Sequence, residues 1–174
     1  LELIGVVGVG IFASVGTGWG PIAPLLFIYG IGVGLATAQL TGVIMVDVPN
    51  EKAGQASGSQ STVRQVGSAL GIAVLGTMLF SGTQASLETR LDDIGVPASG
   101  QVMIVDAVVD SAGGAIPSLE GALTPQVGVE QAKEIVVASE EAFTDGAKLA
   151  AWAAAAFLLL GFLSSFRLGR VKKG

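Results

Sequence analysis

The chain has 174 residues, of which 51% are hydrophobic and 13% are charged, and its formal net charge is −5. Its mean hydropathy of +0.69 is too high for an ordinary soluble domain of this length, so we expect a membrane protein. The sequence has no cysteine and no histidine, which removes disulfides, thiolate and imidazole metal ligands, and the usual general base near pH 7. We therefore expect neither a metal site nor an enzyme.

Four apolar segments predict four transmembrane helices, because about 20 apolar residues in a helix cross a bilayer core about 30 Å thick. The segments are residues 3–16, 22–46, 62–82 and 147–166. The first is short and has no basic region or cleavage site, so we expect a helix cut by the chain start and not a signal peptide. A turn over residues 17–21, ending at Pro21, separates the first two segments.

The loop over residues 47–61 joins the second and third segments and is itself predicted to be partly helical. Asp47 and Pro49 end one helix, since proline cannot continue the hydrogen-bond ladder. Asn50 is a favourable N-cap for the next helix, and Glu51 in the first turn suits the helix dipole. We expect the helix of the third segment to begin here.

Small and polar residues share one face of the third segment, whereas apolar residues occupy the other. Close packing against neighbouring helices is expected at six glycines, Gly30, Gly34, Gly54, Gly58, Gly67 and Gly71. Five polar residues are candidates for lining a cavity: Thr37, Gln39, Thr41, Gln65 and Ser68. For the Thr and Ser residues among them, the alternative is a hydrogen bond to the carbonyl four residues earlier in the same helix. Arg64, with Asp47, is a candidate cytoplasmic gate or interface. The alternative is that Arg64 is an interfacial anchor.

Residues 83–146 form a polar insert before the last helix, with eleven acidic residues and only two basic ones, Arg90 and Lys133. Apolar residues recur there at helical spacing, so we expect short amphipathic helices, the last of which runs into the final span. The tail, residues 167–174, is basic. Because cytoplasmic loops are enriched in Lys and Arg, we expect the tail and the 47–61 loop inside and the insert outside the cell membrane.

Residues 48–76, VPNEKAGQASGSQSTVRQVGSALGIAVLG, follow the glycine-rich YGIGVGLATAQLTGVIM. This region resembles the C-terminal part of the fourteen-helix drug:proton antiporters of the major facilitator superfamily, the EmrB/QacA type. The matching residues are Pro49, Glu51, Lys52, Ala53, Gly54, Ala56, Ser57, Gly58, Arg64, Gln65, Gly67, Ala69, Gly71, Ala73 and Gly76. The match covers residues 22–82, and the remainder is similar in layout only. Ser61 stands where that family often has asparagine.

The resemblance implies the C-terminal fragment of a proton-coupled multidrug efflux transporter that works by alternating access. The two middle helices would line the cavity, and the outer two would be peripheral. The energy source would be the proton gradient, without a cofactor, and the fragment would not pump alone. Its partners would be the lipid bilayer, the missing N-terminal helices and small amphipathic substrates.

A different hypothesis is a standalone four-helix membrane module whose acidic outer region binds a partner or a cation. No D-x-D-x-D-G calcium loop supports a cation site. Nucleic-acid binding is not expected, because the basic residues are few and lie at the inner edge of the membrane.

Overall fold

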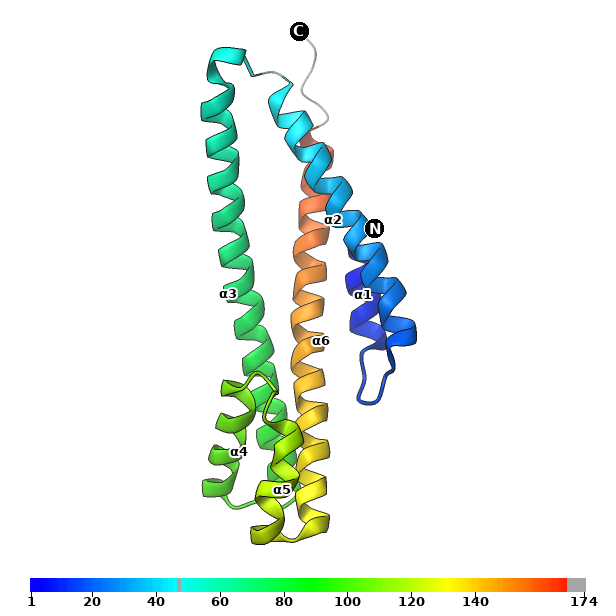
Figure 1. Cartoon of the computed structure of the whole chain (residues 1–174), viewed down its shortest axis with the longest axis vertical. Helices are drawn as coiled ribbons and strands as arrows, with labels where there is room; N and C mark the ends of the chain where they lie inside the picture. Colours follow the sequence, from blue (N-terminus) through cyan, green and yellow to red (C-terminus); the bar gives the residue numbers. More distant parts are fainter. Residues whose placement is uncertain (47, 169–174) are drawn as a thin grey trace.

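The computed structural model describes residues 1–46 and 48–168, the last two by their backbone alone. All of the regular structure within these residues is helical, so the all-α prediction is confirmed (Figure 1). The elements are α1 (Glu2–Phe12), α2 (Trp19–Met45), the 3-10 helix η1 (Asn50–Lys52), α3 (Ala53–Asp93), α4 (Ala98–Asp110), α5 (Ile116–Val127) and α6 (Val129–Leu168).

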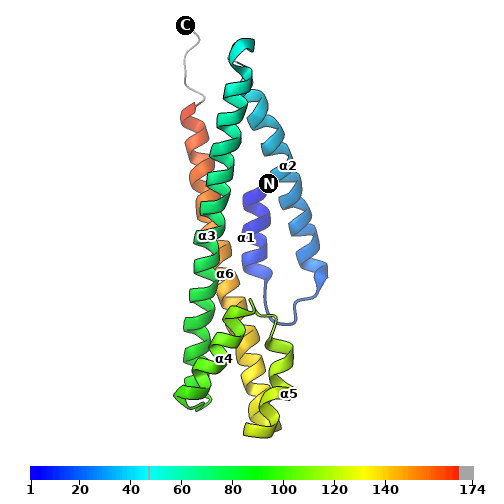
Figure 2. The same ribbon diagram turned by 60° about the vertical axis from the view of Figure 1, so that its left-hand side comes forward.

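Two long helices, α3 with 41 residues and α6 with 40, run side by side through the molecule (Figures 1 and 2). At 1.5 Å per residue each is about 60 Å long, roughly twice the thickness of a bilayer core. Each therefore continues beyond its predicted span, residues 62–82 or 147–166, into the insert. A long apolar helix and a soluble amphipathic helix are joined without a break.

Three helices among the described residues are long and apolar enough to cross a membrane: Trp19–Met45, Asn50–Asp93 and Val129–Phe166. The first predicted span corresponds to α1, which has only 11 residues. The structure therefore supports three spans and one shorter apolar helix, and a fourth span stays a prediction.

The boundary between α1 and α2 differs from the prediction at both ends. α1 ends at Phe12 instead of residue 16, because the hydroxyl of Thr17 donates a hydrogen bond to the Phe12 carbonyl at 3.1 Å and closes a turn there. α2 begins at Trp19, earlier than residue 22, and takes Pro21 into its first turn. Proline is tolerated at that place because its missing N–H would have no partner within the helix.

The predicted N-cap at Asn50 is wrong. Asn50 opens η1, and its side chain makes no capping hydrogen bond. The turn is closed by the backbone instead, since the N–H of Lys52 donates to the Pro49 carbonyl at 2.9 Å. The prediction that the polar stretch is helical nevertheless agrees with η1 and the first turns of α3.

The buried core lies at one end of the molecule, in a region that we call the cap, residues 83–146 (Figure 2). There α4 and α5 fold against the adjoining parts of α3 and α6. The principal core residues are Leu87, Leu91, Ile104, Val105, Val108, Ile116, Leu119, Leu123, Ala132 and Ile135. Gly95, with a φ of +80°, turns the chain between α3 and α4, and the Val96 N–H caps α3 by bonding the Leu91 carbonyl.

The membrane part of the chain buries little surface within the chain itself. Gly32 is the only buried residue of α2, and among the described residues of α3 none before Thr83 is buried. Large apolar side chains such as Val63 and Ile72, both 73% exposed, point away from the rest of the protein. Such a surface is typical of helices that contact lipid or further helices.

Candidate functional site

The structure brings polar side chains of α2 and α3 together at one place. The side-chain amide of Gln60 in α3 donates a hydrogen bond to the hydroxyl of Thr41 in α2, with an N–O distance of 3.3 Å. The same hydroxyl donates to the Thr37 carbonyl one turn earlier in α2, also at 3.3 Å. Of the five predicted cavity residues, Thr41 therefore lies next to α3. Its bond to the Thr37 carbonyl is the hydrogen bond within the helix that was the alternative for the hydroxyl residues.

The other predicted polar residues lie apart from this contact. Gln39, Gln65, Ser68 and Arg64 are all exposed. Asp47 lies outside the described residues, so its role with Arg64 at a cytoplasmic gate or interface stays a prediction. Gln60 was missed as a site residue by the sequence reasoning. Its position on the same face of the helix as Arg64, four residues away, is the signal that could have identified it.

The six glycines predicted for helix packing make no close contact within the described chain. A Cβ atom added at any of them would have nothing within 4 Å, as seen for Gly30, Gly34, Gly54, Gly58, Gly67 and Gly71. Their proposed role therefore depends on helices or lipid from outside this chain. Glycines four residues apart indicate which face can pack closely, but they do not identify the partner.

Other glycines do bring helix backbones together. A Cβ atom on Gly5 of α1 would lie 2.6 Å from the Cβ atom of Tyr29 in α2, and one on Gly32 of α2 would lie 2.7 Å from the Glu2 nitrogen. Any side chain at either position would therefore collide with the neighbouring helix. These contacts fix α1 against α2, which is the best-defined helix pair outside the cap.

The backbones of α3 and α6 come into close contact at Gly82, Thr83 and Gly146. A Cβ atom on Gly146 would lie 2.8 Å from the Thr83 nitrogen and would also collide with the Thr83 hydroxyl and the Leu79 carbonyl. Thr83 is 0% exposed, and among the described residues its hydroxyl has no hydrogen-bond partner. We call this contact the α3–α6 crossing.

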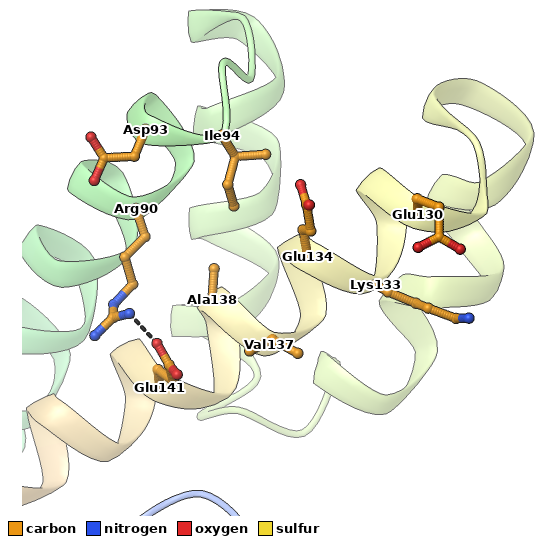
Figure 3. Close-up of a pocket in the computed structure, with 9 residues that line it drawn as sticks. All are labelled: Arg90, Asp93, Ile94, Glu130, Lys133, Glu134, Val137, Ala138 and Glu141. Atoms are coloured by element: carbon orange, nitrogen blue, oxygen red, sulfur yellow. Dashed lines mark hydrogen bonds and ion pairs between the residues drawn. The ribbon is translucent and has the colours of Figure 1, made fainter.

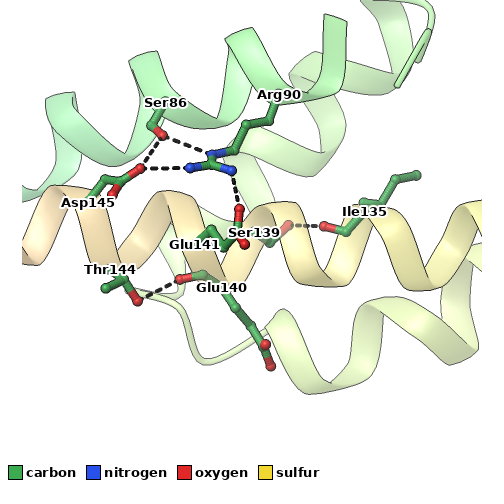
Figure 4. A network of polar contacts seen from close by, with 8 residues as sticks. All are labelled: Ser86, Arg90, Ile135, Ser139, Glu140, Glu141, Thr144 and Asp145. Carbon is green, nitrogen blue, oxygen red and sulfur yellow. Dashed lines mark hydrogen bonds and ion pairs between the residues drawn. The ribbon is translucent and has the colours of Figure 1, made fainter. Parts of the chain in front are cut away.

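A polar network on the cap side of the crossing joins the same two helices (Figure 4). Arg90 of α3 pairs with Glu141 and with Asp145 of α6, the latter at 3.0 Å. Ser86 donates to the same Asp145 oxygen at 2.9 Å and accepts a hydrogen bond from Arg90 Nε at 3.3 Å. The charged side chains are 34–45% exposed, so solvent weakens each pair. The network was not predicted from the sequence. Arg90 entered that prediction only in the count of basic residues that sets the membrane orientation.

A shallow groove of about 420 Å³ lies beside this network, between the end of α3 and the first half of α6 (Figure 3). Ile94, Val137 and Ala138 form its apolar part. The charged side chains around it are Arg90, Asp93, Glu130, Lys133, Glu134 and Glu141. Over the described part of the chain, no group of three or more acidic side chains is placed to hold a metal ion. The acids are spread along the helices as a solvated surface.

The chain is similar in sequence to curated transporters. It is 34% identical over 139 residues to the multidrug resistance protein Stp of Mycobacterium tuberculosis, and the match covers 79% of this chain and 25% of that protein. It is 33% identical over 162 residues to the drug efflux pump JefA of the same organism, covering 90% of this chain and 31% of that protein. No family model and no solved structure matches.

A third relative is a probable actinorhodin transporter of Streptomyces coelicolor, 34% identical over 77 residues, which is 44% of this chain and 13% of that protein. The chain is thus related to drug efflux transporters and spans about a quarter to a third of the two mycobacterial relatives. Since the relatives are transporters, the expectation that the chain is not an enzyme is confirmed. They also support a multi-pass membrane protein, together with the three apolar helices.

Proposed function

We propose that the chain is the C-terminal part of a proton-coupled multidrug efflux transporter of the major facilitator superfamily, of the EmrB/QacA type. The observation that carries the proposal is the 34% identity to a multidrug resistance protein over 79% of the chain. The antiporter-like sequence at residues 48–76, which covers η1 and most of the membrane part of α3, supports the finer assignment.

In this proposal the polar contact between α2 and α3 faces the transport pathway. Thr41 and Gln60 form this contact, and Thr37, Gln39, Gln65 and Ser68 lie on the exposed parts of the same helices. Further helices of the transporter would cover the exposed glycines and form the rest of the cavity. Alternating access would rock this group of helices against the other half around a site near the middle of the membrane.

The proposed topology places the cap outside the cell membrane and the α2–α3 connection inside. The basic residues support it, since Lys52 and Arg64 lie at and after this connection, whereas the cap has only two basic residues, Arg90 and Lys133, against eleven acidic ones. The cap and this connection lie at opposite ends of the molecule, as a spanning protein requires (Figure 1). The C-terminus is accordingly proposed to be cytoplasmic.

The test is an efflux assay on the full-length transporter that carries this sequence, with ethidium as the substrate and a protonophore to remove the proton gradient. We expect efflux that the protonophore abolishes. Arg64→Ala should reduce efflux more than it reduces the amount of protein in the membrane, whereas Lys133→Ala in the cap should leave both unchanged. Efflux that survives the protonophore would contradict proton coupling. An equal loss of efflux and protein would make Arg64 an interfacial anchor only.

A further inference from the structure

The contact between α3 and α6 is uneven along the two helices. In the cap, Leu87 and Leu91 of α3 and Ile135 and Ala142 of α6 are all 0% exposed. Towards the other end, the described part of α3 has no buried residue before Thr83. The side chains of Val63, Val66 and Leu70 there are 54–73% exposed. The two helices thus share a buried core on the cap side, whereas α3 contributes no buried residue among those described on the opposite side.

The α3–α6 crossing lies between the buried cap side of the helix pair and the exposed part of α3. Gly82 and Gly146 bring the backbones into direct contact, since a Cβ atom on Gly82 would lie 3.2 Å from the Gly146 Cα atom. The Leu149 side chain lies beside this contact, at 3.0 Å from a Cβ atom on Gly82, but the backbones themselves touch. Close-packed backbone surfaces of this kind resist deformation.

A second attachment fixes the angle between the helices. Arg90 lies about two turns beyond Thr83 in α3 and pairs with Glu141 and Asp145 of α6. The core residues of α4 and α5 then pack across both helices. Two separated points of attachment define an orientation, which a single point of contact would leave free.

We propose that the α3–α6 crossing is a fixed pivot. The cap-side parts of α3 and α6 move as one rigid body with α4 and α5. Residues 53–76 of α3 change their tilt relative to α6 by bending of the continuous helix between Gly76 and Gly82. The Gln60–Thr41 hydrogen bond is the one side-chain hydrogen bond that connects this part of α3 to another helix among the described residues. The proposed pivot concerns the motion of these helices and does not depend on the proposed function. Its consequence, that transport opens the inner end of the α3–α6 pair and not the outer end, rests on the proposed function.

The experiment measures distances between spin labels in the 174-residue chain in lipid nanodiscs. The sequence has no cysteine, so spin labels attach only to the cysteine pairs that are introduced by substitution. The outer pair joins the two helices in the cap and is Glu88→Cys with Lys133→Cys. The inner pair joins them at the opposite end and is Gln55→Cys with Leu163→Cys. All four are exposed positions on α3 and α6. We expect the distance distribution of the inner pair to be at least about twofold broader than that of the outer pair.

Glycine substitutions with matched controls test the pivot itself. Gly146→Ala places a methyl group 2.8 Å from the Thr83 nitrogen, so the outer distribution should broaden or shift. Gly161→Ala, in the same helix but with open space around it, should change nothing. If Gly146→Ala does not fold, Gly82→Ala is the milder variant, because the nearest atom is the flexible end of Leu149 at 3.0 Å, and Gly76→Ala is its control.

Two results would overturn the proposal. One is an outer distribution as broad as the inner one in the unsubstituted chain. The other is the same outer distribution for a crossing glycine variant and its control. Neither measurement uses transport, so failure of the pivot would leave the proposed efflux function standing. A failed efflux assay would likewise leave the pivot standing.

Discussion

The guanidinium group of Arg90 in α3 lies 3.0 Å from a carboxylate oxygen of Asp145 in α6. The two residues are 55 positions apart in the sequence, and the same guanidinium also pairs with Glu141. All three side chains are at least one third exposed, so the network contributes orientation more than stability. It joins the two long helices on the cap side of the α3–α6 crossing.

Arg90→Gln should lower the free energy of unfolding of the chain by at most about 1 kcal/mol, because exposed ion pairs are weak. The loss should shrink at high salt, which screens the charges. Denaturant titration followed by circular dichroism measures both effects. Lys133→Gln is the control, since Lys133 makes no ion pair with any described residue. A loss that salt does not change would contradict the electrostatic origin.

Leu87→Ala and Leu70→Ala compare two leucines of the same helix. Leu87 is 0% exposed in the cap core, whereas Leu70 is 62% exposed. Truncation of the buried residue should cost about 2–5 kcal/mol of unfolding free energy, because it removes apolar contacts and leaves a cavity. Truncation of the exposed one should stay within about 0.5 kcal/mol. Equal effects in the denaturant titration would mean that the cap core is not the main source of stability.

Thr83→Val should leave the unfolding free energy unchanged or raise it by up to about 1 kcal/mol. The buried hydroxyl has no hydrogen-bond partner among the described residues, and its removal ends a desolvation cost. Ser139→Ala is the comparison, because Ser139 is also fully buried but its hydroxyl has a hydrogen-bond partner. Its buried hydroxyl donates to the Ile135 carbonyl at 2.7 Å, so its loss should cost about 0.5–1.5 kcal/mol. A clear destabilisation by Thr83→Val would indicate that the Thr83 hydroxyl has a hydrogen-bond partner.

Single cysteines test the proposed topology in intact cells. Asp106 in α4 and Gln55 at the start of α3 are both exposed, and the sequence has no other cysteine to interfere. A membrane-impermeant maleimide should label Asp106→Cys directly and Gln55→Cys only after permeabilisation, as the distribution of basic residues implies. The reverse pattern would invert the topology.

The sequence was sufficient for the helical class, because apolar runs and helical spacing are local signals. It was also sufficient for the turn before η1, where Pro49 cannot continue a helix. It did not locate the end of α1, which depends on the hydrogen bond from Thr17 to Phe12. It placed packing at glycines four residues apart, whereas Gly146 contacts Thr83 from a distant part of the chain. Helical phase identifies a small-residue face, but only the tertiary structure identifies what it touches.

The unbroken length of α3 and α6 has a practical consequence for imaging. The cap is built on the ends of these two helices and not on a flexible linker, so it stands at a constant position relative to the membrane part of α6 (Figure 1). Small membrane proteins are hard to align in electron micrographs because little protrudes from the detergent belt. Here about half the length of each long helix would project from it. The cap would serve as a built-in fiducial, marking the direction of the bilayer normal in every particle.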